Sequence, residues 1–555
     1  MRLAEPVRPE LPGQRFDVVV VGGGINGVAV ARECARAGQR TLILEQNDFG
    51  SGTSSRSTRI IHGGLRYLEH GELGLVRESL VERERLLREK SHLVRPMTFL
   101  LAMPRQHIAF SLRSALAIRA GLWLYGKMAH SCREPLRTHP AAEQLERSLD
   151  SGEHWSVFDY EDAQCEFPER LIAEWLTEAV RAGAVARNHT EVLEVEVRDG
   201  RAVAVKTRDR ISQAEERYQA EHIVNASGPW VDRVCAKSNF SAARMIMGVR
   251  GSHILLPSWP DAPNAAVYME ASDGRQVFIL PWNHQVMVGT TEVRDDSDPG
   301  TVAPSAEEIE YLLNAFRTVF SLAGYTTSDV TAAFSGIRPL PYGKNECLAN
   351  ISRKHVLHDH KNEGAAGLIS VIGGKLTTAA LLGRQCARKL GLSVAEPGMA
   401  LVASGVANGL GNTLTQWSRQ ASMASGVPEA SVRAIAEWHG IRAWCVLRPA
   451  QQDPRLAEIL CPHTHHVIAE AVDAVRHECA VTLGDVLLRR VPVALSGCWD
   501  EQCTLQAAKR IGGALGWSSS FTAHALLDFE EERNRFLHPS LTSGSEPVKL
   551  SKRLA

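Results

Sequence analysis

A glycine-rich turn between a buried strand and a helix is the feature that most restricts how this chain folds. The segment from Asp17 to Val21 is a run of valines, the turn Gly22-x-Gly24-x-x-Gly27 follows it, and small apolar residues recur at helical spacing up to Ala37. A second short apolar run, from Thr41 to Leu44, comes next. This order predicts a βαβ unit, in which a helix connects two parallel strands.

Each glycine of the turn has its own role in binding a dinucleotide. Gly22 permits the tight turn, Gly24 lets the backbone approach a pyrophosphate, and Gly27 lets the helix pack closely on the sheet. The N-terminus of the helix offers N–H groups and partial positive charge to the phosphates. Glu45, at the end of the second strand, is expected to accept hydrogen bonds from the adenosine ribose. The sequence therefore predicts a dinucleotide site, and these residues leave FAD and NAD as alternatives.

The segment after Glu45 favours FAD. It reads "NDFGSGTSSRSTRIIHGG" and resembles the loop that covers the pyrophosphate and reaches the flavin in FAD-dependent oxidoreductases of the D-amino-acid-oxidase-like class. The resemblance implies hydroxyl donors at Thr53, Ser54, Ser55 and Ser57. "NASGPW" resembles a later strand of that class, whose glycine turn, here at Gly228, passes close to the cofactor. We expect the FAD to be non-covalent, because no cysteine or histidine has a recognisable flavin-linking context.

The rest of the sequence predicts how the domains are arranged along the chain. Residues from about 245 to 345 contain β-branched runs bounded by Pro and Gly, typical of an antiparallel sheet that covers a substrate. The expected fold class is α/β, a Rossmann-like FAD-binding domain interleaved with this antiparallel-sheet substrate domain, followed by an all-α C-terminal domain. The expected boundaries within residues 1–395 are about 15–75, 150–245 and 345–395 for FAD binding and 76–149 and 246–344 for substrate binding. They continue as a linker over 396–415, a helical domain over 416–538 and a disordered tail over 539–555.

Composition excludes some classes of function. The 555 residues include 62 Lys+Arg and 63 Asp+Glu, so the net charge of −1 gives no sign of nucleic-acid binding. The 11 cysteines form no Cys-x-x-Cys pair, which favours a reduced, cytoplasmic compartment. The segment Cys461-Pro-His463-Thr-His465-His466 contains metal-ligand residue types, but no second cluster completes a coordination shell. We therefore predict no metal site and interpret the segment as a polar loop before a helix.

One segment has the composition of a membrane-surface helix. No uncharged apolar run approaches the roughly 20 residues of a spanning helix. The stretch from Ser111 to Met128, however, combines leucines with Trp123, Tyr125, Arg119 and Lys127. Such a helix can lie in a lipid interface on the cytoplasmic face of a membrane, although packing on the protein's own core is the alternative.

Several motifs in fixed order identify a more specific resemblance. They are "GTSSRSTRIIHGGLRYLEHGELGLVRESLVERERLL", "NASGPWVD", "RGSHILLP", "PWNHQVMVGTTEV", "FSGIRPL" and "IGGKLTT". Together they resemble the FAD-dependent, respiratory-type sn-glycerol-3-phosphate dehydrogenases over residues 15–390. "RHECAVTLGDVLLRR" resembles a segment of that family's C-terminal helical domain. The resemblance implies oxidation of sn-glycerol 3-phosphate to dihydroxyacetone phosphate, with electrons passed from FAD to a membrane quinone.

The resemblance also assigns the substrate pocket. A phosphate dianion needs fixed cations, and planar guanidinium groups match its oxygens bidentately. Arg338 and Arg353 are expected to bind the phosphate, with Lys375 and Arg66 in the same cavity. The residues expected to contact the glycerol part are Tyr67, His62 and His253.

His62 is the first candidate for the base that removes the C2 hydroxyl proton, because a neutral imidazole can accept it. His253 and an ordered water are the alternatives.

A helix starting near Lys375 is expected to offer N–H dipoles to reduced flavin. The remaining expected cofactor contacts are Ile25, Asn26, Gly63, Gly64, Leu65, Gly374, Leu376 and Thr377.

Three rival interpretations stay open at this point. A glycerol-3-phosphate oxidase would use oxygen as the acceptor, and an amine or amino-acid oxidase would share the fold. A non-catalytic FAD-binding paralogue would act through the helical domain. The oligomeric state is likewise open, with a homodimer as one candidate.

Overall fold

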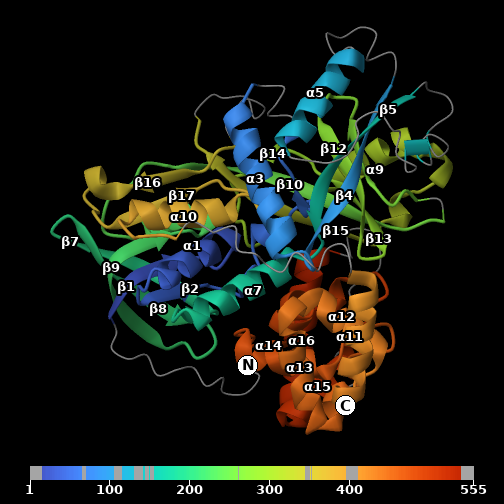
Figure 1. Ribbon diagram of the computed structural model, residues 1–555. Coiled ribbons are helices and arrows are strands. Elements are labelled where there is room, and N and C mark those ends of the chain that lie inside the picture. Colours follow the sequence, from blue (N-terminus) through green and yellow to red (C-terminus); the bar gives the residue numbers. More distant parts are fainter. Residues whose placement is uncertain are drawn as a thin grey trace.

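The computed structural model describes residues 15–65, 71–104, 115–129, 142–143, 145, 149, 155–260, 262–343, 351, 353–395 and 410–538. Two sheets with their covering helices form the upper part of the molecule in Figure 1, and a bundle of helices lies below them. This arrangement confirms the expected α/β architecture with a helical C-terminal domain.

The first sheet contains the predicted βαβ unit. Strand β1 (Arg15–Val21) pairs in parallel with β2 (Thr41–Leu44) and with β9 (Glu215–Asn225). Helix α1 (Ile25–Arg36) connects β1 to β2 and contacts α7 (Pro168–Arg181) and α10 (Ala379–Lys389). The full order is β16-β17-β9-β1-β2-β6, with β7 and β8 attached beside β9. The other strands are β6 (Val185–Arg187), β7 (Thr190–Arg198), β8 (Arg201–Asp209), β16 (Val356–Asp359) and β17 (Leu368–Ile372).

The second sheet runs in the order β14-β10-β13-β12-β11-β4-β5-β3, with β15 paired to β10. Most pairs are antiparallel, as predicted, but β11 pairs with β4 in parallel. Its strands are β3 (Ile60–Ile61), β4 (Val94–Pro104), β5 (Trp155–Cys165), β10 (Ile246–Pro257), β11 (Ala266–Glu270), β12 (Gln276–Trp282), β13 (Gln285–Gly289), β14 (Val293–Arg294) and β15 (Ala332–Pro341). Its associated helices are α3 (Leu73–Glu89), α5 (Ala115–Met128) and α9 (Ala306–Val319).

The chain passes from one sheet to the other more often than the expected domain boundaries imply. Strands β3 and β5 belong to the second sheet, although residues 15–75 and 150–245 were expected to form FAD-binding parts. The reason is that β3 pairs with β5, which in turn pairs along its whole length with β4. The segment after β2 therefore leads directly from one sheet into the other.

The C-terminal region is helical, as expected. It contains α11 (Leu410–Ser425), α12 (Glu429–His439), α13 (Ala443–Leu447), α14 (Ile468–His477), a π-helical turn over Asp485–Arg490, α15 (Glu501–Leu515) and α16 (Ser519–Leu537). Most of the expected linker and all of the expected tail lie outside the described residues. Within the described part of the chain, no helix has the length and apolarity to span a membrane.

Buried ion pairs attach the helical domain to the first sheet. Arg490 donates to both carboxylate oxygens of Asp48 at 2.6 and 2.8 Å, and Asp48 comes from the loop after β2. Arg170 of α7 donates to both oxygens of Glu478 at 2.7 and 3.1 Å. Although burial alone would raise it, the pKa of Asp48 is lowered because Arg490 and its neighbour Arg489 stabilise the carboxylate. Each carboxylate also pairs with a second arginine, Arg489 for Asp48 and Arg442 for Glu478, so two buried charge networks join the helical domain to the first sheet and its helix α7.

Candidate active site

A cavity of about 970 Å³ lies between the two sheets. Its wall includes the carboxyl ends of β1 and β2, the loop after β2, strands β12 and β15, and the double-glycine turn after β17. The predicted residues that line it are Gly22, Gly24, Ile25, Asn26, Glu45, Thr53, Ser54, Ser57, His62, Gly64, Leu65, Gly228, Arg338, Arg353, Gly374, Lys375, Leu376 and Thr377.

Four predicted residues do not line this cavity: Gly27, Ser55, Gly63 and His253. Ser55 is buried and donates its hydroxyl to the Gly50 carbonyl at 2.6 Å, so it holds the loop together. Two further predicted residues, Arg66 and Tyr67, lie outside the described residues.

The glycine turn has the close contacts that its sequence predicts. Gly22 has a φ of +106°, and a Cβ there would lie 2.6 Å from the carbonyl oxygen of Ala226. A Cβ on Gly27 would lie 1.9 Å from the Gly22 oxygen, so this glycine serves helix packing. Apart from its chain neighbours, the described residues bring a single atom, Ser54 Oγ at 3.3 Å, within 4 Å of the hypothetical Cβ of Gly24. Gly24 therefore presents bare backbone to the cavity.

Glu45 lies on the cavity wall beside this turn. One carboxylate oxygen accepts from Gly23 N at 2.7 Å, and the other accepts from Asn47 N at 2.8 Å. Burial raises the pKa of Glu45, and the two N–H groups oppose that shift. The backbone thus fixes the carboxylate at the end of β2, where a ribose hydroxyl is expected.

The hydroxyl-rich loop after β2 is pinned to both sides of the cavity. Ser54 Oγ accepts from Ile25 N at 3.0 Å, at the start of α1, and Thr53 Oγ1 donates to the Ile337 carbonyl of β15 at 2.7 Å. The loop therefore connects the first sheet to the second. Thr53 and Ser54 are thus held by protein partners and also line the cavity.

The second glycine turn meets the first through Asn26. Asn26 Nδ2 donates to the Gly373 carbonyl at 3.1 Å, and a Cβ on Gly374 would lie 2.4 Å from that same nitrogen. Asn26 Oδ1 is buried and has no hydrogen-bond partner among the described residues, which leaves an acceptor on the cavity wall. Helix α10 begins at Ala379 and not near Lys375, because residues 376–378 form a turn. The bare glycine backbone, the fixed Glu45 carboxylate and this acceptor fit a dinucleotide cofactor.

His62 and Lys375 are two of the titratable groups that line the cavity. Burial lowers the pKa of His62 to about 4, and the positive charges of Lys375 and Arg83 lower it further. Burial also lowers the pKa of Lys375 to about 7, with a further contribution from Arg353. His62 is therefore a neutral imidazole near pH 7, whereas Lys375 titrates in that range.

Arg338 and Arg353 are two of the arginines that line the cavity, and each has a partner that the sequence did not indicate. Arg338 donates to Thr290 Oγ1 at 2.9 Å and to the Thr291 carbonyl at 3.3 Å. Arg353 forms an ion pair with Glu292 at 2.6 Å. The "GTTEV" motif contains all three partners, but its spacing did not indicate that it would hold the arginines.

His253 is held by contacts that the sequence did not indicate. Its ring is buried, stacks on Phe334 with ring centroids 4.9 Å apart, and shares a hydrogen bond of 3.0 Å between Nε2 and Thr58 Oγ1. A Cβ on Gly289 would lie 2.1 Å from this ring. Burial lowers the pKa of His253 to about 3. His253 is not among the residues that line the cavity, although its partner Thr58 is, and its contact with the glycerol part stays a prediction.

A buried network behind the His62 segment was also missed. Gly63 N donates to Tyr125 Oη at 2.8 Å, and a Cβ on Gly63 would lie 2.5 Å from that oxygen. Arg83 donates to Asp162 at 2.5 Å, and the Tyr125 hydroxyl also donates to Asp162. Tyr125 was predicted to be an interfacial aromatic, but it is fully buried. The glycine at 63 therefore makes room for Tyr125.

Two family models match the chain. The model described as FAD dependent oxidoreductase matches residues 17–388, and the model described as the C-terminal domain of alpha-glycerophosphate oxidase matches residues 400–521. The first match covers both sheets, and the second covers most of the helical domain.

Several curated proteins are similar to this chain in sequence. A glycerol-3-phosphate dehydrogenase of Synechocystis is 35% identical over 503 residues, which are 88% of this chain and 90% of the relative. The aerobic glycerol-3-phosphate dehydrogenase of Escherichia coli is 35% identical and covers 67% of this chain and 73% of its own length. A D-erythritol 1-phosphate dehydrogenase of Brucella abortus, also 35% identical, covers 65% of this chain and 71% of its own length.

A solved structure has the same fold. The glycerol-3-phosphate dehydrogenase from Bacillus halodurans complexed with FAD superposes with a TM-score of 0.73 over 96% of each chain, at 23% identity.

Proposed function

This chain belongs to the FAD-dependent oxidoreductase family, and we propose that it oxidises sn-glycerol 3-phosphate to dihydroxyacetone phosphate with a non-covalently bound FAD. The observation that carries this proposal is the presence of Arg338, Arg353 and Lys375 in one cavity with the neutral imidazole of His62. The FAD, when bound, accepts the hydride from C2 of the substrate.

The cations define the class of substrate. A carboxylate needs one bidentate arginine, whereas a phosphate dianion gains from several fixed positive charges. Arg338 and Arg353 are held in place by Thr290 and Glu292, so they lose little side-chain freedom on binding. Lys375 adds a third charge when it is protonated. This set argues against an amino-acid oxidase and in favour of a polyol phosphate.

His62 is the proposed base for the C2 hydroxyl. Its lowered pKa keeps the ring neutral and able to accept a proton at neutral pH. The backbone on either side is fixed, because His62 N donates to Thr377 Oγ1 at 3.1 Å and Gly63 N donates to Tyr125. The role of Tyr125 is positional: it holds the segment that carries the base.

The proposed cofactor contacts divide between the two glycine turns. Gly22, Gly24 and the start of α1 would hold the pyrophosphate, and Glu45 the adenosine ribose. Gly64, Gly374 and Thr377, together with their neighbours Leu65, Lys375 and Leu376, would surround the flavin.

We also propose that the electrons pass to a membrane quinone and that α5 provides the membrane contact. Trp123 and Leu124 are 50% and 40% exposed, and Arg119 and Lys127 are exposed on the same helix. In Figure 1, α5 lies at the end of the molecule remote from the helical domain. Exposed apolar and cationic side chains together suit an anionic lipid surface.

Sedimentation with anionic vesicles tests this contact. The double variant Trp123→Ala/Leu124→Ala should lose binding, whereas the control Ile441→Ala, which removes a fully exposed apolar residue of the helical domain, should retain it. Equal binding by all three proteins contradicts a role for α5. A homodimer stays a prediction.

Anaerobic bleaching of the flavin tests the proposed reaction. The panel comprises sn-glycerol 3-phosphate, D-erythritol 1-phosphate, glycerol and amino acids. Rapid bleaching by the first compound, with none by glycerol, supports the proposal. Faster bleaching by D-erythritol 1-phosphate would reassign the substrate, bleaching by amino acids alone would indicate an amino-acid oxidase, and a stable yellow colour throughout would indicate a non-catalytic protein. Reoxidation by a soluble quinone and by oxygen then distinguishes a dehydrogenase from an oxidase.

A further inference from the structure

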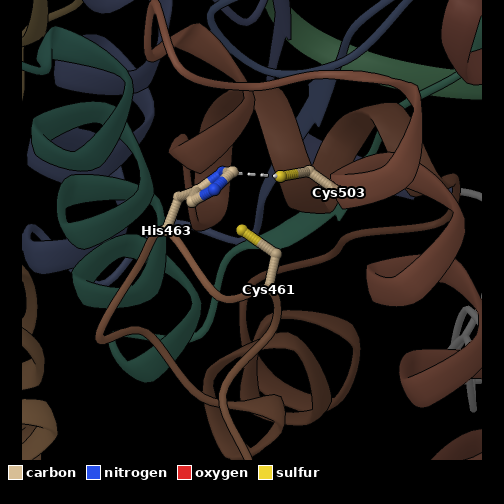
Figure 2. Close-up of side chains that lie close together, drawn as sticks. All are labelled: Cys461, His463 and Cys503. Carbon is tan, nitrogen blue, oxygen red and sulfur yellow. Dashed lines mark hydrogen bonds between the residues drawn. The ribbon is translucent and has the colours of Figure 1, made fainter.

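Two cysteines and a histidine meet in the helical domain, far along the chain from the cavity residues described above. Cys461 and His463 come from the loop before α14, and Cys503 comes from the first turn of α15. Their ligand atoms all lie within 4.8 Å of one another, and Cys503 Sγ is 3.3 Å from His463 Nδ1. Figure 2 shows the two sulfur atoms and the imidazole turned toward one another.

The fold supplies a third metal-ligand residue that the segment around Cys461 lacks in the sequence. The segment from Cys461 to His466 carried ligand types without a partner cluster, and the fold brings Cys503 to it from 40 residues beyond His463. His466 is not part of the group, because its Nδ1 bonds Glu470 at 3.0 Å and its ring stacks on Trp438. The loop thus directs one histidine inward to a carboxylate and another to the two thiols.

The loop that holds Cys461 and His463 is tightly closed. Leu460 N donates to the His466 carbonyl at 2.8 Å, Thr464 N donates to the Cys461 carbonyl at 3.3 Å, and Ile459 bridges Val467. On the other side, Asp500 caps α15 by accepting from Cys503 N at 2.7 Å. Both ligand-bearing segments are therefore fixed by their own backbone, independently of any ion.

The charge and burial of the group suit a soft divalent cation. Both cysteines are 1% exposed, whereas His463 is exposed. Two thiolates would neutralise a divalent ion, and coordination of the ion itself deprotonates a cysteine thiol. Zinc takes sulfur ligands at about 2.3 Å and nitrogen at about 2.0 to 2.1 Å in a tetrahedron, so small side-chain rotations would close this group around it.

The other clusters of metal-ligand types in the described chain have different explanations. The group of Asp48, His189 and Asp485 is neutralised by Arg489 and Arg490. The group of His439, Asp473 and Glu478 is neutralised by Arg170 and Arg442. In the third group both His358 and His360 bond Glu363. Two buried thiols beside an imidazole have no comparable ionic role.

We propose that Cys461, His463 and Cys503 bind one Zn²⁺, with water in the fourth position. The ion would tie the loop over 459–467 to α15. Because that loop leads into α14, and Glu478 directly after α14 pairs with Arg170, the ion would stabilise the part of the helical domain that holds the first sheet. The role is structural and does not depend on the proposed substrate.

The metal content of the full-length, FAD-loaded protein tests the proposal. Protein purified under reducing conditions and given one equivalent of Zn²⁺ should retain about one zinc per chain after desalting, as the three-ligand site requires. Replacement by Co²⁺ should produce the strong d–d bands of a tetrahedral thiolate site, in the red region where oxidised flavin does not absorb. His463→Gln and Cys503→Ser should abolish both signals, whereas His465→Gln, in the same loop, should keep them.

The flavin content of each variant reports whether it has folded. His463→Gln alters an exposed side chain, so it is the decisive variant where Cys503→Ser fails to fold. A chelator should lower the unfolding temperature of the zinc-loaded protein and leave that of His463→Gln unchanged. Wild-type protein that neither retains zinc nor develops the cobalt bands overturns the proposal. Retention of the metal by His463→Gln, or a Cys461–Cys503 disulfide in the reduced preparation, also overturns it.

Discussion

The hydroxyl of Tyr125 donates to both carboxylate oxygens of Asp162, at 2.8 and 3.0 Å, while it accepts the N–H of Gly63 at 2.8 Å. One phenol therefore connects α5, β5 and the segment beside His62. Burial raises the pKa of Asp162 to about 6, against the stabilising charge of Arg83. The carboxylate depends on its few donors to remain ionised.

Removing this hydroxyl is expected to destabilise the protein and loosen the segment beside His62. Tyr125→Phe leaves Gly63 N without its acceptor, at about 1 to 3 kcal/mol for a buried group left unsatisfied. It also removes one donor to Asp162, which keeps its bond from Arg83. The midpoint of thermal unfolding should fall, by about 2 to 4 °C for each kcal/mol lost. Tyr325→Phe is the control, because its hydroxyl bonds the Pro257 carbonyl at the surface. Equal midpoints for the two variants would show that the network contributes nothing.

Substitutions of the two glycines after His62 are expected to have different effects. Gly63→Ala would place a Cβ 2.5 Å from Tyr125 Oη and 2.6 Å from Leu80 Cδ2, so it should lower stability. Gly64 has a φ of +83° and lines the cavity. Gly64→Val should therefore give a folded protein that loses FAD or binds it weakly. Flavin content after gel filtration and the thermal midpoint separate the two effects, and full flavin occupancy in Gly64→Val would contradict a flavin contact there.

One side of the cavity could be predicted from the sequence. The strand, glycine turn and helix from β1 to β2 were predictable because their signals are local, and so were the acidic residue after β2 and the hydroxyl-rich loop. The Gly373-Gly374 turn followed from the same strand and glycine pattern. Local periodicity and turn chemistry therefore sufficed for one whole side of the cavity.

Contacts between distant segments escaped prediction. Tyr125 has the composition of an interfacial residue, but its buried partner Asp162 lies on another element and has no periodic signal. His253 stacks on Phe334 and lies against Gly289, and its motif does not indicate these contacts. Cys503 is likewise isolated in the sequence and meets His463 only through the packing of α15. Pairs of this kind are set by tertiary packing, which a single sequence does not report.

The loss of the proposed base should slow the chemical step alone. His62→Gln keeps much of the size and hydrogen bonding of the side chain but cannot accept a proton, so flavin reduction at saturating substrate should slow by about 10² to 10⁴. FAD content and substrate binding should be retained. Anaerobic stopped-flow reduction measures the rate. A variant reduced at the wild-type rate would reassign proton removal to His253 or to an ordered water and leave His62 as a packing residue.

Truncation of Arg338 should weaken substrate recognition. A charge-assisted hydrogen bond contributes about 1.5 to 3 kcal/mol, so Arg338→Ala should reduce kcat/KM for glycerol 3-phosphate by roughly 10- to 150-fold, and by more in a desolvated site. The FAD content should be unchanged. Arg317→Ala, on α9 and away from the cavity, is the matched control and should keep wild-type kinetics. Near-normal kcat/KM in Arg338→Ala would remove this guanidinium from the phosphate site.

We expect kcat/KM to decline at alkaline pH and again in strong acid. The pKa of Lys375 is lowered to about 7, so its ammonium is present below that pH and is lost as the pH rises through it. Phosphate binding should weaken accordingly on the alkaline side. The pKa of His62 is lowered to about 4, so the neutral base is present above pH 4 and disappears only in stronger acid.

Lys375→Arg provides the test, because a guanidinium stays charged over the whole range. The alkaline decline of kcat/KM should move upward or vanish in this variant, while the acid side stays unchanged. The substrate phosphate titrates near pH 6, by analogy with phosphorylated side chains, and does so equally for both proteins, so its contribution cancels in the ratio of the two profiles. An alkaline limb that is identical in the wild type and in Lys375→Arg would show that the ammonium of Lys375 does not control substrate binding.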